Sequence, residues 1–369
     1  NDRIKYNERL HHVNGDETLL EDTHGKLQKY GGDDPTESAA VQQVVADMSD
    51  YMTTVVFADA KKYKDVMHSC KNRHELCAYW KTIGECESNT NFMQKQCAVA
   101  CHSCHVLDFK HRCPVDETIP MALTQPDDLD NMFQRVLTLE KYGPQPLSMP
   151  NPPSNATTDI QDGDIQDGAW LVVLNNFLTP EECDRLIELG GHQGYKQSAD
   201  VGQKKFDGTY DSNVNSGRTS NNAWCMGACY NDEISQRVHA KMEDVLGIPR
   251  ANYEYLQVLR YEVGQFYNTH HDYIGHHVDR QPGVRTLTLY LYLNDVEEGG
   301  GTEFPTMGLE VTPRKGKAVL WPSVLNQDPN AKDIRTEHGA LPVKKGIKYG
   351  ANAWIHQRDF KEALDRKCV

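Results

Sequence analysis

The residues with the clearest capacity for chemistry form a consecutive run, His270-His271-Asp272, in a stretch rich in β-forming residues. In a strand, residues i and i+2 point to the same face, so His270 and Asp272 can hold one metal ion while His271 points away. A third ligand must then come from another part of the chain. Two imidazoles and one carboxylate on one face of an octahedron leave three positions open, which is the arrangement typical of non-haem Fe(II) oxygenases.

The third ligand and a matching cation are expected downstream, at His338 and Lys348. A histidine and a lysine separated by a turn at Pro342 and Gly346 can face each other across adjacent strands. We expect His338 to complete the metal site. Lys348 would then be a fixed cation for the remote carboxylate of a dicarboxylic acid.

Other residues nearby offer alternatives to this assignment. His277-Val278-Asp279 repeats the spacing of the first metal pair, but glycine and proline flank it on both sides, which favours a loop. His356 lies late in an expected strand, and we interpret it as a packed or surface histidine. Lys344 and Lys345 flank the turn and are expected to face solvent.

The elements that must position these residues begin after Ala169, where the proline-rich linker gives way to patterns typical of strands and helices. A capping box with proline at the first helical position, residues 179–182, opens a helix through Leu189. A second helix is expected from about residue 231 to 246, before Gly247. Short β-rich runs are expected at 170–174, 253–267, 286–293, 318–321 and 348–355. The pattern predicts an α+β fold with a sandwich, barrel or jelly-roll core and helices packed outside.

The N-terminal half contains a dense group of cysteines. Six of the eleven cysteines fall between residues 70 and 104, which indicates a disulfide framework in an oxidising compartment. Zinc is the rival interpretation, because Cys101 and Cys104 have a C-x2-C spacing, but the group contains no second such pair. A segment this short cannot bury a sufficient core and needs cross-links. Spacing alone does not select among the possible pairings.

Five further cysteines lie outside this group. Cys225 and Cys229 could form a second metal pair, although a local disulfide, or one bond to Cys183, is expected in an oxidising compartment. The sequence alone does not assign the partners of Cys113 and Cys368. Because eleven is odd, at least one thiol is free or pairs between chains.

The remaining segments give the predicted domain plan. Residues 1–69 form a polar N-terminal segment whose stretch 38–57 has helical periodicity, and residues 70–104 form the disulfide module. Residues 105–168 hold a helix at 127–139 and a proline-rich linker at 143–168, in which Asn155 is a possible glycosylation site. Residues 169–369 form the large C-terminal domain.

Charge and hydropathy limit the partners of this 369-residue chain. The net charge of −14 repels nucleic acid and anionic membranes, and no Lys/Arg cluster reverses this locally. Neutral or basic protein partners fit better, or the charge serves only solubility. No apolar run approaches the about 18 residues needed to span a bilayer. No signal peptide is visible. The chain starts at Asn1 with polar residues, so it is expected to be processed or trimmed already.

The C-terminal stretch resembles the prolyl 4-hydroxylase family over 169–360. The resemblance is carried by residues 170–189, 218–220, 256–272, 285–295, 299–305, 346–349 and 352–356. It implies a double-stranded β-helix core, with His270, Asp272 and His338 as iron ligands and Lys348 as the partner of the 2-oxoglutarate C5 carboxylate. Tyr261 and Thr302 fall on positions that help to hold 2-oxoglutarate, and Tyr267 and Arg285 on positions near the substrate proline. Tyr349 stands where many members have Trp, a departure that bears on substrate choice.

The cysteine group resembles the ShKT domain, the sea-anemone-toxin fold. Its six cysteines, together with Trp80, Gly84 and Met93, fall where that family has them. The resemblance implies pairing of the first cysteine with the sixth, the second with the fourth and the third with the fifth: Cys70–Cys104, Cys77–Cys97 and Cys86–Cys101.

Together these resemblances imply an Fe(II)- and 2-oxoglutarate-dependent dioxygenase, assisted by ascorbate, that converts peptidyl proline to 4-hydroxyproline and releases succinate and CO2. We expect it in the endoplasmic reticulum lumen, elsewhere in the secretory pathway or outside the cell. The substrate is a proline-containing protein or peptide, either collagen-like or from a hydroxyproline-rich wall or matrix, and an oligomer is possible. One alternative is the same fold acting on another substrate. Another is an extracellular structural protein with a silent oxygenase fold, marked by a broken metal triad or a missing lysine.

Overall fold

The computed structural model describes residues 24–30, 34–151 and 166–369. The chain divides into two compact units. The smaller unit comprises residues up to 114 together with 202–211, and the larger comprises 115–201 and 212–369. The predicted glycosylation site Asn155 lies outside the described residues.

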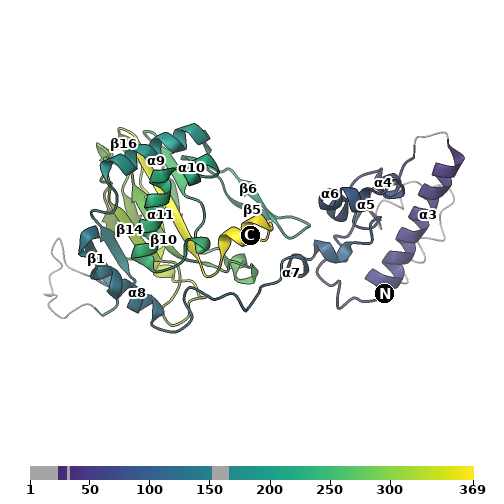
Figure 1. The fold of residues 1–369 in the computed structure, drawn as a ribbon, viewed down its shortest axis with the longest axis horizontal. Helices are drawn as coiled ribbons and strands as arrows, with labels where there is room; N and C mark the ends of the chain where they lie inside the picture. The colour runs from purple at the N-terminus through teal and green to yellow at the C-terminus, as the bar shows by residue number, and fades with distance from the viewer. Residues whose placement is uncertain (1–23, 31–33, 152–165) are drawn as a thin grey trace. The chain divides into compact units, whose positions relative to one another are not determined.

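The smaller unit is built around one long helix, α3 (Pro35–Tyr51), which continues as a π-helical turn, η1 (Met52–Val56) (Figure 1). Asp34 caps the helix by accepting a hydrogen bond from the Thr36 N–H. This confirms the predicted helix at 38–57, although it begins three residues earlier because the cap and Pro35 define its first turn. The cysteine module shares one apolar core with this helix. Its short elements are α4 (Cys77–Thr82), α5 (Glu85–Ser88) and α6 (Thr90–Gln96), and η2 (Cys104–Leu107) and α7 (Phe109–Arg112) follow them.

Three disulfides cross-link the cysteine module. They are Cys70–Cys104, Cys77–Cys97 and Cys86–Cys101, the same pairs that the resemblance to the ShKT domain implies. Because Cys101 and Cys104 are both used in these bonds, they are not available to zinc. In the larger unit Cys225 bonds to Cys229, and Cys183 is a free, buried thiol.

Two antiparallel sheets form the core of the larger unit. The nine-stranded sheet has the order β2-β1-β3-β14-β10-β17-β8-β7-β4, and the four-stranded sheet has the order β13-β12-β15-β9. All strand pairs described within these sheets are antiparallel except β1 with β2. The strands of the first sheet are β1 (Pro144–Met149), β2 (Gln166–Asp167), β3 (Leu171–Leu174), β4 (Lys196–Gln197), β7 (Asn221–Trp224), β8 (Gln257–Tyr261), β10 (Arg285–Tyr292), β14 (Ala318–Pro322) and β17 (Lys348–His356). Those of the second are β9 (Tyr267–His270), β12 (Thr302–Phe304), β13 (Leu309–Val311) and β15 (His338–Ala340).

Two further two-stranded sheets and several 3-10 turns are present among the described residues. β11 (Glu298–Gly299) pairs with β16 (Val343–Lys345), and β5 (Asp200–Lys204) forms a two-stranded sheet with β6 (Tyr210–Asn213). The turns are η3 (Glu140–Tyr142), η4 (Arg250–Asn252), η5 (Gly275–Asp279) and η6 (Ile334–Thr336).

Alternation along the strands separates two cores, as β10 illustrates. Leu287, Leu289 and Leu291 pack with the helices on one face of the large sheet. Tyr290 and Tyr292 point to the opposite face, where residues of both sheets form a second apolar cluster. This arrangement confirms the predicted α+β fold with a double-stranded β-helix core.

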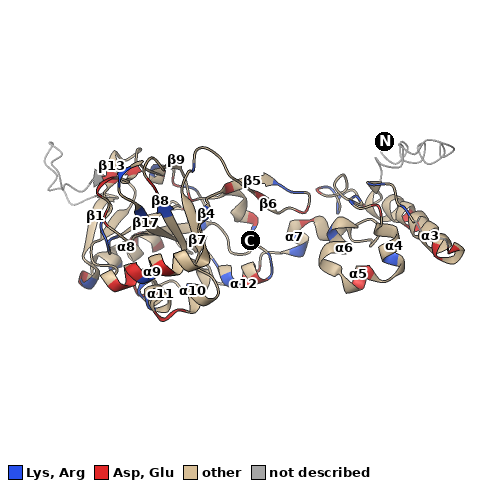
Figure 2. Cartoon of the chain, turned by 90° about the horizontal axis from the view of Figure 1, so that it is seen from above, with Lys and Arg blue, Asp and Glu red and all other residues tan. Residues whose placement is uncertain are grey.

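Helices cover the outer face of the large sheet. In both views α9 (Pro180–Gln193), α10 (Ala228–Asn231) and α11 (Glu233–Leu246) lie together on one side of the sheet (Figures 1 and 2). The predicted capping box is present, since Thr179 accepts from the Glu182 N–H and the Glu182 carboxylate accepts from the Thr179 N–H. The helix α12 (Phe360–Asp365) follows β17.

The predicted linker at 143–168 is wrong for its first residues. Residues 144–149 form β1, which pairs with β3. Prolines 144 and 146 suggested a linker, but a register shift after Pro146 accommodates them in the sheet. The preceding helix α8 (Asp128–Leu137) also belongs to the larger unit, where Phe133 stacks on Trp170 with ring centroids 5.0 Å apart. The larger unit therefore begins near residue 115, well before the residue 169 that the sequence suggested.

Charged residues of both signs are interspersed over the two units, with acidic positions along α3 and α9 (Figure 2). None of the helices in the described ranges is long and apolar enough to cross a membrane.

Disulfide loop length predicts how much each cross-link stabilises its unit. Cys77 and Cys97 are separated by 20 residues, whereas Cys225 and Cys229 are separated by 4. Because a longer loop restricts the unfolded chain more, C77S/C97S should cost the smaller unit about 3 kcal/mol, and C225S/C229S should cost the larger unit about 2 kcal/mol. Hydrogen–deuterium exchange of peptides from each unit of the full chain measures both. Equal losses would contradict the prediction.

Candidate metal centre

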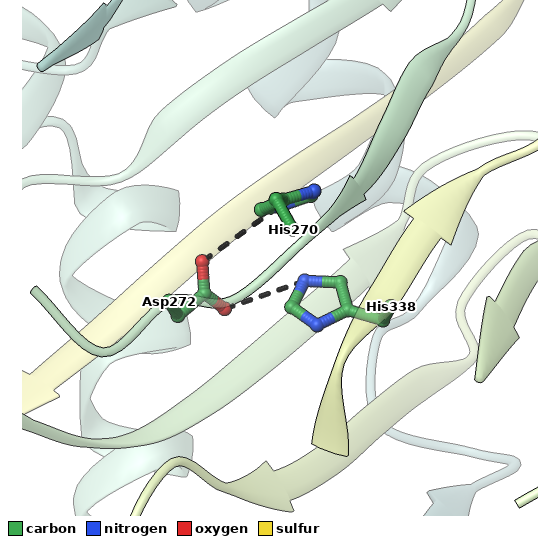
Figure 3. A group of neighbouring side chains, drawn as sticks. All are labelled: His270, Asp272 and His338. Carbon is green, nitrogen blue, oxygen red and sulfur yellow. Dashed lines mark ion pairs between the residues drawn. The ribbon is translucent and has the colours of Figure 1, made fainter. Parts of the chain in front are cut away.

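Three side chains predicted from separate parts of the sequence converge in the larger unit. His270, Asp272 and His338 point toward one another (Figure 3), and their ligand atoms all lie within 4.8 Å of each other. The Nε2 atoms of His270 and His338 lie 4.0 and 3.5 Å from the Asp272 carboxylate. Within the described ranges, no other group of three or more such side chains meets this distance.

Strand register accounts for the convergence. His270 ends β9 and His338 begins β15, and the two residues are direct partners across this antiparallel pair. Their rings are consequently close, with centroids 4.4 Å apart. Asp272 lies just beyond the end of β9, so a bend in the chain, rather than strand alternation, brings its carboxylate to the histidines. His271 points away and its Nε2 atom lies 2.8 Å from the Asp333 carbonyl oxygen.

Main-chain carbonyls fix the tautomers of the two histidines. His270 Nδ1 lies 2.9 Å from the Asn268 carbonyl oxygen, and His338 Nδ1 lies 3.0 Å from that of Thr336. A carbonyl oxygen only accepts hydrogen bonds, so Nδ1 carries the proton in each neutral ring. Each Nε2 therefore has a lone pair directed at the centre, which is the arrangement that a metal ion requires of histidine.

The electrostatics of the centre favour the ionised carboxylate. Burial opposes ionisation of Asp272, but His338, His270, Arg285 and a hydrogen bond from the Thr288 hydroxyl outweigh it and lower its pKa to about 2. Desolvation and the neighbouring His338 lower the pKa of His270 to about 3. Two neutral imidazoles and one carboxylate are the donor set of non-haem Fe(II) sites, so the residues present fit this metal.

Lys348 lies in an enclosed aromatic pocket. Its side chain is 0 % exposed and, in the described part of the chain, its Nζ atom has no hydrogen-bond partner. The rings of Tyr261, Tyr290 and Tyr292 surround the ammonium, with centroids 5.2, 5.3 and 5.6 Å from Nζ. Burial lowers the pKa of Lys348 to about 7. An unpaired buried cation is a site for an anion, so the pocket fits a carboxylate of 2-oxoglutarate.

Contrary to the expectation, Lys348 and His338 do not lie on adjacent strands. Lys348 begins β17 in the large sheet, whereas His338 lies in β15 of the smaller one. The residues between them include the strand β16, which the sequence analysis did not predict because it interpreted this stretch as a turn. The two sheets meet at this level, since Tyr292 Oη in β10 lies 2.7 Å from Thr302 Oγ1 in β12.

Tyr267, predicted to lie near the substrate, stacks on the candidate ligand His270 with centroids 3.6 Å apart. Its hydroxyl donates to Asp200, and the guanidinium of Arg218 lies over its ring and pairs with the same carboxylate. Burial raises the pKa of Tyr267, with Asp200 adding to the effect, so its hydroxyl stays protonated. Arg218 entered the sequence analysis only as part of a motif, and nothing in the sequence indicated Asp200.

Arg285 belongs to a buried ionic cluster that the sequence analysis missed. Its Nε donates to Glu254, which also contacts His356 Nε2 at 2.8 Å. The guanidinium lies 3.8 Å from the ring centroid of Trp354. Although burial opposes it, Arg285 and His356 lower the pKa of Glu254. His356 is packed, as interpreted, but in an ion-pairing role that only the pairing of distant strands reveals.

The alternative candidates for the metal ligands and for the cation lie outside the site. His277 lies in η5, between the strands, and is absent from the metal cluster. Lys344 and Lys345 are exposed and pair with Glu298 and Glu297.

Comparison with known proteins defines the class of the larger unit. Residues 256–356 match the 2OG-Fe(II) oxygenase superfamily, and this stretch contains the three convergent residues and Lys348. Residues 69–104 match the ShK domain-like family. The chain is a dioxygenase of the 2OG-Fe(II) oxygenase superfamily and carries an ShK-like module.

Individual relatives narrow the class. The chain is 36 % identical to prolyl 4-hydroxylase 5 of Arabidopsis thaliana over 211 residues, which cover 52 % of this chain and 69 % of that protein. It is 35 % identical to the probable prolyl 4-hydroxylase 8 of the same plant, covering 58 % of this chain and 83 % of the relative. Among solved structures, the 2OG complex of the viral collagen prolyl hydroxylase of Paramecium Bursaria Chlorella virus-1 matches with 28 % identity, a TM-score of 0.40 and coverage of 50 % of this chain and 95 % of that chain. The chain belongs to the prolyl 4-hydroxylase family.

The burial of Lys348 predicts an unusual effect on stability. Its pKa is about 7 in the folded protein, against an ordinary value of 10.5, so between these values the unfolded chain binds a proton that the folded chain does not. Stability therefore rises with pH in this window, and the cost of the buried charge is greatest below pH 7. K348M should stabilise the larger unit by about 1–4 kcal/mol at pH 7, and less at pH 9.5.

Chemical denaturation followed by tryptophan fluorescence measures this effect, because Trp170, Trp224, Trp321 and Trp354 all lie in the larger unit. The exposed Lys345 provides the matched control, and K345M should change the stability by less than about 0.5 kcal/mol. A K348M protein less stable than wild type at both pH values would contradict the prediction.

Proposed function

We propose that this protein is a prolyl 4-hydroxylase that converts proline residues of a polypeptide to 4-hydroxyproline. His270, Asp272 and His338 hold Fe(II), and Lys348 binds the C5 carboxylate of 2-oxoglutarate. The observation that carries the proposal is the pairing of a complete two-histidine, one-carboxylate cluster with a buried, unpaired lysine in one unit. Family membership supports the choice of proline as the target.

Iron and 2-oxoglutarate, when bound, supply the oxidation: one O2 is consumed, 2-oxoglutarate becomes succinate and CO2, and one oxygen atom enters the proline C4–H bond. The chain's own residues orient the reactants. The carbonyls of Asn268 and Thr336 keep the histidine Nε2 atoms available, and Thr288 holds the Asp272 carboxylate. Tyr261 and Thr302 line the cosubstrate end, and Tyr267 and Arg285 the substrate side.

The compartment follows from the disulfides. Disulfides in the module and at Cys225–Cys229 are suited to an oxidising environment, so we place the protein in the endoplasmic reticulum lumen, elsewhere in the secretory pathway or outside the cell. Ascorbate would keep the iron reduced. The partner is a proline-containing protein or peptide.

The first test is succinate release with Fe(II), ascorbate and 2-oxoglutarate, with and without proline-rich peptides. The wild type should release succinate in a peptide-stimulated manner and form 4-hydroxyproline, detected by mass spectrometry. H270A should reduce turnover by at least about 100-fold, because it removes a metal ligand. H271A is the matched control, since its ring points away from the cluster.

The outcomes separate the candidate functions. Turnover without peptide hydroxylation would point to another substrate for the same fold. Absence of both turnover and iron binding would favour a structural protein with a silent oxygenase fold, and would overturn the proposal.

Binding of the cosubstrate gives a second test that does not depend on turnover. K348M should weaken 2-oxoglutarate binding to the iron-loaded protein by at least about 10-fold, because it removes the charge that pairs with the remote carboxylate. Binding to the wild type should weaken as pH rises above about 7, where the unliganded lysine loses its proton. Calorimetry measures both effects, with K345M as control. Unchanged affinity in K348M would place the carboxylate elsewhere.

A further inference from the structure

The second H-x-D motif, His277-Val278-Asp279, does not contribute to the metal centre. Its histidine nevertheless lies close to Arg285. His277 lies in η5, with its ring centroid 5.6 Å from that of His356. His356 contacts Glu254, and Glu254 accepts from Arg285. The loop thus adds a further imidazole to the buried ionic cluster on the predicted substrate side.

The Nδ1 atom of His277 is buried and has no hydrogen-bond partner within the described residues. Burial, followed by His356 and Arg285, holds the pKa of His277 well below 6.5, so its ring is neutral. A neutral imidazole has one donor nitrogen and one acceptor nitrogen. Leaving such an atom unpaired in the interior is unfavourable, and a bound ligand can supply the missing partner.

A second buried polar atom without a partner lies in the same cluster, and this atom can only donate. The indole Nε1 of Trp354 is also buried without a partner in the described part of the chain. Trp354 stacks against Arg285, whose Nε atom is committed to Glu254. With the ring proton of His277 on Nδ1, the region around Arg285 has two buried donors without acceptors.

The proposed substrate has the opposite imbalance. Proline has no main-chain N–H but retains its carbonyl, so a proline-containing segment presents more acceptors than donors. An enzyme that binds such a segment through its main chain must supply N–H groups.

We propose that His277 is a substrate-binding residue whose Nδ1–H donates a hydrogen bond to a main-chain carbonyl of the proline-containing segment. This inference rests on the proposed function and adds a residue outside the predicted site. It assigns His277 alone in the η5 loop to recognition of the polypeptide, separate from the binding of iron and 2-oxoglutarate.

Three variants of the full-length protein test the role of His277. H277F keeps a ring but removes both nitrogens, and should raise the KM for a proline-rich peptide by about 3- to 10-fold, the effect of one neutral hydrogen bond. H277N retains a donor near the position of Nδ1 and should restore KM to within about 2-fold of wild type. V278A, in the same loop with a 50 % exposed side chain, is the matched control and should leave KM unchanged.

Other readouts separate substrate binding from a structural role. The KM for 2-oxoglutarate and the peptide-independent release of succinate should not change in H277F, since neither involves the polypeptide. An unchanged peptide KM in H277F, or an equal defect in H277N and H277F, would overturn the inference while leaving the proposed function standing. Absence of peptide hydroxylation by the wild type would overturn both.

Discussion

The pairing of β9 with β15 is the constraint on which the site depends. It sets His270 opposite His338 in the smaller sheet. A slip of one residue in either strand would turn one imidazole to the other face, because side chains alternate along a strand. The small sheet also holds β15 in place on its other edge, because β12 pairs there and β15 is therefore fixed between β9 and β12. Main-chain hydrogen bonds therefore bring the two candidate histidine ligands together before any metal is bound.

The large sheet contributes a buried positive charge. It carries Lys348 at the start of β17, opposite Tyr261 in β8. Among the described residues the ammonium has no hydrogen-bond partner, and Glu310 acts on it only through space. Gly350 belongs to the same pocket: a side chain there would collide with the Tyr290 hydroxyl. A buried cation without a hydrogen-bonded partner lowers the stability of the empty protein and creates a preference for an anionic ligand. In the proposed function, one sheet thus provides the positions for the metal, while the other provides the charge that binds the cosubstrate.

The sequence predicted the parts of the site that are carried by local motifs. His270, Asp272, His338 and Lys348 were found because their spacing has chemical meaning, and the helices around 180 and 235 because caps and periodicity are local signals. The cluster of Glu254, Arg285 and His356 could not be found in this way, because its members come from three segments. The pairing of β10 with β17 brings Arg285 to His356, and the bridge between Tyr253 and Ile355 brings Glu254 to them. Strand β1 was missed for the opposite reason: its prolines are local signals for a linker, and the sheet overrides them.

The free thiol of Cys183 has a consequence for how the chain matures. Its side chain is fully buried on α9, and burial raises its pKa to about 11. A thiol of this kind forms almost no thiolate at neutral pH and is shielded from attack, so it does not exchange with a disulfide once α9 has docked. Before docking, the same thiol is an ordinary nucleophile. Native cross-linking therefore depends on timing: helix α9 must dock on the sheet before an oxidant or a disulfide isomerase can draw Cys183 into a wrong bond.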